Sequence, residues 1–89
     1  MVSQRVTVIN ETGLHLKPAA AFCRTAVEYQ AVITFTFGDV TANAKSVLSV
    51  LGACVKCGDE IEIVCQGPDE AEALKALTEA VEGGLGETV

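Results

Sequence analysis

Residues 13–20, Gly-Leu-His-Leu-Lys-Pro-Ala-Ala, form a junction at which a predicted strand leads into a predicted helix. Before the junction, apolar and polar residues alternate over residues 2–9, which is typical of a half-buried strand. After it, apolar residues recur at helical spacing, and Pro18 suits the first helical turn because its missing N–H would have no intrahelical partner there. The junction places His15, the only histidine, at the start of a helix over about residues 16–28.

The rest of the sequence alternates between strand and helix patterns. Turn-forming residues 10–13 end the first strand. Period-two runs predict three more strands, apolar residues at three- and four-residue steps predict two more helices, and a two-residue turn at 38–39 makes the second and third strands antiparallel neighbours. The expected segments are strands at 32–37, 40–43 and 60–65, a two-turn helix capped by Ser46 and ended by Gly52, and a helix that begins with a capping box of Asp69 and Glu72 and closes at Gly83-Gly84.

This β-α-β-β-α-β-α order predicts an α+β fold, an open-faced β-sandwich with one largely antiparallel four-stranded sheet and three helices on a single face. The 89 residues are expected to form a single domain over residues 1–89. A domain of this size has a modest core, which favours a small carrier or binding module over a self-contained enzyme.

Charge and hydropathy restrict the expected partners. The net charge of −6 disfavours nucleic acid and anionic membranes. Residues 1–58 carry five basic and three acidic side chains, whereas residues 59–89 carry one basic and nine acidic side chains, so the first part could dock an acidic partner. The sequence has no apolar run long enough to span a membrane and no signal-peptide pattern, so a cytoplasmic location with reduced cysteines is expected.

Three runs of sequence resemble the HPr family, the phosphocarriers of the bacterial phosphoenolpyruvate-dependent sugar phosphotransferase system. They are residues 13–20, Lys45-Ser46-Val47-Leu48 and Gly83-Gly84-Leu85-Gly86-Glu87, and the likeness covers essentially the whole chain. The resemblance implies an HPr-like fold and a phosphohistidine on the pros nitrogen, Nδ1, of His15. It also implies a monomeric cosubstrate, without a cofactor, that receives its phosphoryl group from enzyme I and passes it to IIA domains of sugar permeases.

The residues around His15 suit this chemistry on physical grounds. An imidazole is partly neutral at cytosolic pH and can act as a nucleophile. The helix start offers the backbone N–H groups of Leu16 and Lys17 to phosphoryl oxygens, and the Lys17 ammonium adds positive charge. Thr12 completes the expected phosphate-stabilising set. The family usually has arginine where this chain has Lys17 and a small residue where it has Leu16, so we expect different transfer kinetics, phosphohistidine lifetime or partner choice.

Ser46 and the short helix after it suggest a docking and regulatory surface. Four of the six residues from 46 to 51 are apolar, and one helix cannot bury all of them against a single sheet. The residues expected to dock partners are Ala20, Arg24, Lys45, Val47, Leu48 and Leu51. The resemblance implies that HPr kinase/phosphorylase phosphorylates Ser46. An alternative is a regulatory HPr-like protein that acts through Ser46, for example with a catabolite-control transcription factor, and contributes little to sugar transport.

Cys54 and Cys57 have the spacing of a metal-binding or redox pair, which leaves a further alternative. A structural zinc would need two more ligands, but Cys23 and Cys65 are expected to face the core from another helix and strand. We therefore expect no metal site and interpret the cysteines as small packing residues.

Overall fold

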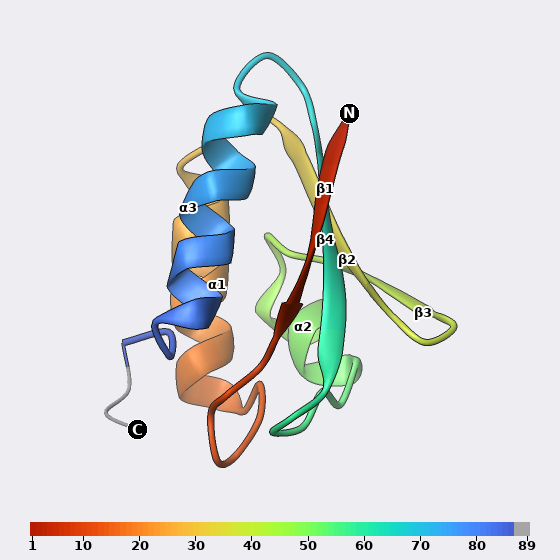
Figure 1. Cartoon of the computed structure of the whole chain (residues 1–89), viewed down its shortest axis with the longest axis vertical. Coiled ribbons are helices and arrows are strands. Elements are labelled where there is room, and N and C mark those ends of the chain that lie inside the picture. Colours follow the sequence, from red (N-terminus) through yellow and green to blue (C-terminus); the bar gives the residue numbers. More distant parts are fainter. Residues whose placement is uncertain (87–89) are drawn as a thin grey trace.

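The computed structural model describes residues 1–86 and has the predicted order of elements (Figure 1). The elements are β1 (Val2–Thr7), α1 (Leu16–Val27), β2 (Val32–Phe37), β3 (Val40–Asn43), α2 (Val47–Gly52), β4 (Glu60–Gln66) and α3 (Glu70–Glu82). Glu87, the last residue of the third run quoted above, lies outside the described residues. Within residues 1–86, we find no helix with the length and apolar character needed to cross a bilayer.

The four strands form one antiparallel sheet in the order β1-β4-β2-β3. Phe35 of β2 lies opposite Ile63 of β4 on one side and Ala42 of β3 on the other, and Ile61 of β4 lies opposite Val6 of β1. The three helices lie against one face of this sheet and leave the other face uncovered (Figure 1). The predicted open-faced sandwich is therefore confirmed.

The core lies between the sheet and the helices. Alternate residues of β2 and β4 are buried, as expected for strands covered on one face. On α1 the buried side includes Phe22, whose ring packs edge-to-face on Phe35 with centroids 5.6 Å apart and an interplanar angle of 86°. This contact holds α1, and with it the residue that precedes the helix, over a central strand.

The start of α3 differs from the prediction. Asp69 is the N-cap residue, but its side chain makes no capping hydrogen bond to α3, and Glu72 is exposed. The Asp69 carboxylate instead accepts the backbone N–H groups of Gln30 (2.8 Å) and Ala31 (2.9 Å), between α1 and β2. The predicted capping box is wrong because these two N–H groups compete for the same carboxylate. The Gln30 hydrogen bond is also the main cause that lowers the pKa of Asp69.

The first strand is shorter than the predicted range 2–9. Val8 has left the sheet, and its N–H donates to the carbonyl of Asp59 (2.9 Å) while its own carbonyl accepts the N–H of Gly58 (2.8 Å). The loop between α2 and β4 thus holds the chain immediately after β1. This pairing begins a series of contacts that continues to His15.

Candidate functional site

A tight turn leads from β1 towards His15. The N–H of Gly13 donates to the carbonyl of Asn10 (2.8 Å), and Gly13 has a φ of +68°. A Cβ atom at Gly13 would lie 2.3 Å from the carbonyl oxygen of Val55 and 2.6 Å from the Cα of Lys56. Glycine is therefore required both for the backbone conformation and for the close approach of the two chain segments.

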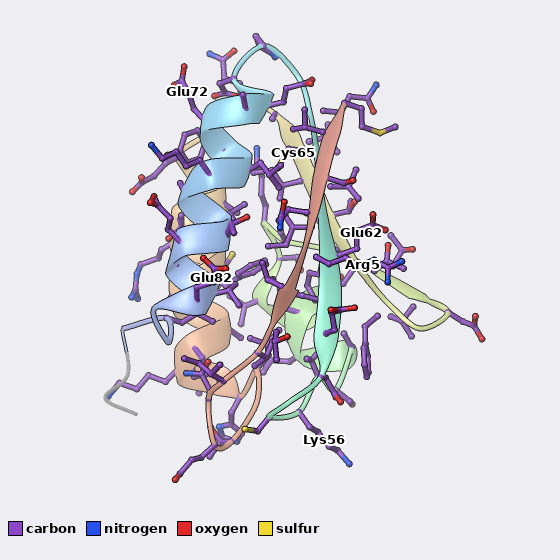
Figure 2. The ribbon with its side chains drawn as sticks, in the orientation of Figure 1. Arg5, Lys56, Glu62, Cys65, Glu72 and Glu82 are labelled. Carbon is purple, nitrogen blue, oxygen red and sulfur yellow. The ribbon has the colours of Figure 1, made fainter. Side chains whose placement is uncertain are left out.

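The next residue anchors the loop. Leu14 is buried, and its N–H donates to the carbonyl of Val55 (3.0 Å), which lies in the loop between α2 and β4. The side chain of Lys56 projects from the same loop, which lies beside the loop between β1 and α1 (Figure 2). Because Leu14 and Val55 are both buried, the backbone that leads to His15 is packed against the core of the protein.

His15 is the N-cap residue of α1. Its backbone is extended (φ −76°, ψ −179°), and its carbonyl accepts the N–H of Ala19 (2.8 Å). The imidazole is exposed. Within residues 1–86, it makes no capping hydrogen bond to α1. The N–H groups of Leu16 and Lys17 precede the first intrahelical hydrogen bonds and are open to an anion. The geometry thus combines an accessible ring with free donors at a positive helix end.

The structure brings the predicted phosphate-stabilising residues to this one junction. Leu16 and Lys17 are exposed in the first turn of α1, and Thr12 is exposed in the turn before it. The side chains of Leu16 and Lys17 therefore lie at the protein surface next to the exposed His15 in the chain. This arrangement is compatible with transient binding of a phosphoryl group.

The second predicted cluster lies on α2, which packs against α1. Ser46 is the N-cap residue, and its hydroxyl accepts the N–H of Ser49 (3.3 Å), as predicted. Val50 is buried, whereas Leu48 is 82% exposed. Val47 and Leu51 are half-buried. The sequence-based inference that a single sheet cannot cover all four apolar side chains is correct.

The remaining predicted docking residues differ in how exposed their side chains are. Ala20 is half-buried and Arg24 is exposed on α1. Lys45 is half-buried, and its ammonium donates to the carbonyl of Tyr29 (2.6 Å), just beyond the end of α1. A positive charge at this end of a helix is favourable because it complements the helix dipole. Arg24 is therefore the more available cation of the two.

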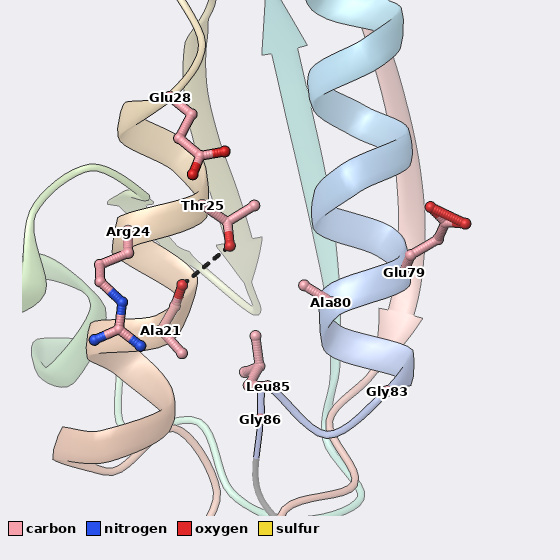
Figure 3. Close-up of a pocket in the computed structure, with 9 residues that line it drawn as sticks. All are labelled: Ala21, Arg24, Thr25, Glu28, Glu79, Ala80, Gly83, Leu85 and Gly86. Atoms are coloured by element: carbon pink, nitrogen blue, oxygen red, sulfur yellow. Dashed lines mark hydrogen bonds between the residues drawn. The ribbon is translucent and has the colours of Figure 1, made fainter.

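Arg24 also borders a groove of about 410 Å³ between α1 and α3 (Figure 3). Glu28 and Glu79 supply negative charge at its border, and Leu85 of the C-terminal segment lies between the two helices. His15 is not among the residues that line the groove. The candidate site is thus an exposed helix start and not a cavity.

The cysteines are not gathered in one cluster in the part of the chain that the structure describes. Cys23 and Cys65 are buried, as expected. Cys54 and Cys57 are exposed free thiols, so the interpretation of these two cysteines as packing residues is wrong. Burial is the main cause that raises the pKa of Cys65. Within residues 1–86, no group of three or more His, Cys, Asp or Glu side chains is placed to hold a metal ion.

Sequence reasoning missed the position of the Asn10 side chain. Asn10 is completely buried, and its Nδ2 donates to the carbonyl of Gly84 (2.8 Å), which follows α3. From the sequence, a buried Asn10 cannot be distinguished from a solvent-exposed turn residue, because asparagine is common in turns, where its side chain bonds to nearby backbone. No local pattern indicates a partner 74 positions away.

Comparison with known proteins relates the sequence and the fold of this chain to one family. The family model "PTS HPr component phosphorylation site" matches residues 2–83. The phosphocarrier protein HPr of Treponema pallidum is 38% identical over 77 residues, which cover 86% of this chain and 88% of the relative. The HPr-like protein Crh of Bacillus subtilis is 35% identical over 92% of this chain and 96% of the relative. The crystal structure of HPr-C-His from Thermoanaerobacter tengcongensis superposes with a TM-score of 0.95, at 34% identity and complete coverage of both chains.

Proposed function

Because this chain belongs to the HPr family of phosphotransferase-system phosphocarriers, we propose that His15 accepts a phosphoryl group from phosphorylated enzyme I and passes it to sugar-specific IIA domains. The observation that carries the proposal is the exposed imidazole at the N-terminus of α1, which makes no capping hydrogen bond to its own helix. The HPr relatives from Treponema pallidum and Neisseria meningitidis are named phosphocarrier proteins and not enzymes, so this chain acts as a cosubstrate of its partners.

The proposed transfer requires little from the carrier besides position and charge. The unprotonated Nδ1 of His15 attacks phosphorus, a nitrogen–phosphorus bond forms, and the bond between phosphorus and the donor breaks. The later transfer to a IIA domain reverses these roles. An exposed ring on a fixed backbone allows both partners to approach in line.

The neighbours of His15 stabilise the phosphorylated state in this proposal. The backbone N–H groups of Leu16 and Lys17 donate to phosphoryl oxygens, as anions commonly bind at helix N-termini. The Lys17 ammonium and the Thr12 hydroxyl add a charge and a donor from the protein surface. Lysine cannot form the two parallel hydrogen bonds of arginine, so the phosphoryl group is held less rigidly than an arginine would hold it.

Partners dock on an apolar surface with a basic rim. This docking surface comprises Ala20 and Arg24 of α1, Lys45, and Val47, Leu48 and Leu51 of α2. The exposed Leu48 is its apolar centre and Arg24 its freest cation. We place the exchange in the cytoplasm, with residues 1–89 acting as one monomeric HPr unit.

Ser46 is the proposed site of regulatory phosphorylation by HPr kinase/phosphorylase. Its position at the N-terminus of α2 tolerates a phosphate locally, so the added negative charge acts on the docking surface and repels acidic partners without unfolding the helix. Treatment with the purified kinase and ATP is expected to add one acid-stable phosphate at Ser46. An unmodified Ser46 by mass spectrometry would contradict this assignment.

A regulatory role with little sugar transport is the second candidate. It is favoured by the similarity to the HPr-like protein Crh and by the position of Ser46 beside the exposed Leu48. In this case the Ser46-phosphorylated chain binds a catabolite-control transcription factor. The presence of His15 favours the carrier role, because binding alone does not need a nucleophile at this place.

The decisive experiment uses enzyme I from the same organism and radiolabelled phosphoenolpyruvate. The carrier role predicts label that is acid-labile and base-stable and that His15→Ala abolishes. Addition of a IIA domain is expected to move the label onto that domain. If the folded chain takes up no label, the carrier role is wrong and the regulatory role remains.

A further inference from the structure

Asn10 occupies an unusual position for a turn residue. Its exposed fraction is 0%, its Nδ2 donates to the carbonyl of Gly84 (2.8 Å), and its own carbonyl accepts the N–H of Gly13 (2.8 Å). One residue thus connects the turn before His15 to the segment that follows α3. A buried side-chain amide has a strong requirement for such a partner, because water cannot replace it.

The C-terminal side of this connection is itself fixed. The N–H of Gly84 donates to Val81 (3.1 Å), and the N–H of Leu85 donates to Ala80 (2.9 Å), which ends α3 in a defined turn. Leu85 has a φ of +53°, is 5% exposed, and lies between α1 and α3 (Figure 3). A leucine in this backbone region costs free energy, which the burial of its side chain offsets.

The loop between Asn10 and His15 is short and is held at both ends. Asn10 holds its beginning through Gly84, and Leu14 holds its end through the carbonyl of Val55. His15 follows Leu14 directly, so a displaced turn would change where the imidazole and the helix N–H groups point. Displacements of about 1 Å at such a site can cost about a hundredfold in rate.

From these contacts we propose that Asn10 is a positioning residue for phosphoryl transfer, because it fastens the His15 loop to the C-terminal segment at Gly84. The inference rests on the proposed carrier role of His15. Asn10 does not touch the phosphoryl group. It fixes the turn from which the chain reaches Leu14 and His15, and the folded C-terminal segment thereby becomes a part of the site.

The first test compares Asn10→Ala with Ile33→Val in the full chain, using enzyme I and phosphoenolpyruvate at a temperature where both variants are folded. Ile33 is a buried residue of β2 outside the loop, and its variant controls for lost stability. Asn10→Ala is expected to lower kcat for phosphorylation about tenfold with KM unchanged, and to shift the ³¹P resonance of phosphohistidine. Ile33→Val is expected to change neither quantity.

The second test acts from the far side of the connection. Leu85→Ala loosens the C-terminal segment without changing the loop, and it is expected to lower kcat in the wild-type background but much less in the Asn10→Ala background. Equal effects in the two backgrounds, or an Asn10→Ala variant with wild-type kcat and ³¹P shift, would overturn the inference. A wild-type chain that takes up no phosphoryl group would instead refute the proposed function.

Discussion

At the scale of single residues, the site depends on which group caps α1. N-cap positions usually hold Ser, Thr, Asp or Asn, whose side chains accept a backbone N–H of the first turn. His15 is the N-cap residue, but its side chain makes no capping hydrogen bond to α1. Its ring is therefore exposed, and the N–H groups of the first turn can donate to an anion. The vacant donors and the proposed nucleophile therefore lie at the same end of α1.

Lys17 is the residue at which a small change tests the electrostatic part of the account. Lys17→Gln removes the charge and is expected to lower kcat/KM for phosphorylation about tenfold, because hydrogen bonds from a charged donor are the stronger ones. Lys17→Arg is expected to lengthen the lifetime of phosphohistidine, because its planar group donates two parallel hydrogen bonds. Steady-state kinetics and the decay of labelled protein measure the two effects. Wild-type values for Lys17→Gln would show that its charge plays no part.

Gly13 tests the packing that supports His15. Gly13→Ala is expected to lower the free energy of unfolding by more than about 1 kcal/mol, because the φ of +68° is strained for alanine and the new Cβ would meet the Val55 carbonyl. Gly52→Ala is the matched control, since a Cβ there meets no atom within 4 Å. Urea unfolding measures both variants, and equal stabilities would contradict the described contact.

At the scale of elements, periodicity was sufficient to predict the four strands and three helices of the described chain. Ser46 was predicted correctly as an N-cap because its hydroxyl has a local partner, Ser49. Asp69 and Asn10 show the opposite case. The partners of Asp69 lie 38 and 39 positions away, and the partner of Asn10 lies 74 positions away. A local sequence pattern carries no information about such contacts. The distance to these partners explains both the wrong prediction of a capping box at Asp69 and the failure to predict the burial of the Asn10 side chain.

The Asp69 contact predicts a pH dependence of stability. Its pKa is lowered in the folded chain, first by the hydrogen bond from the Gln30 N–H, so the contact stabilises the fold above the unfolded value of about 4. This stabilisation is lost as the pH falls from about 4 through the lower folded pKa. Asp69→Asn is therefore expected to reduce the slope of unfolding free energy against pH in this acidic range.

Asp39→Asn provides the control for this titration, because Asp39 is exposed in the turn between β2 and β3. Urea unfolding at a series of acidic pH values gives the slopes. If Asp69→Asn retained the wild-type slope while Asp39→Asn reduced it, the Asp69 carboxylate would not be the group that links folding to pH.

At the scale of the whole molecule, charge is divided in a way that suits a carrier. The basic surplus lies within residues 1–58, which include α1 and α2, and the acidic surplus lies within residues 59–89. We therefore expect partners with acidic surfaces to approach the part of the chain that holds His15. The sequence alone predicted this division, but only the fold places α1 and α2 side by side.

Leu48 tests whether the docking surface works as proposed. Leu48→Glu is expected to raise KM for enzyme I about tenfold with kcat unchanged, because it replaces an apolar contact with a charge that repels an acidic partner. Stability is expected to stay near wild type, since the side chain is 82% exposed. Val32→Glu, at a residue 66% exposed at the start of β2, is the control. A similar KM for the two variants would place docking elsewhere.

The most direct measurement of the central claim is the intact mass of the chain after incubation with enzyme I and phosphoenolpyruvate, followed by fragmentation without acid to locate the modification. The account predicts one phosphoryl group per chain, on His15, and none on a folded His15→Ala variant. A folded wild-type chain without added mass, or a phosphoryl group located on another residue, would contradict it.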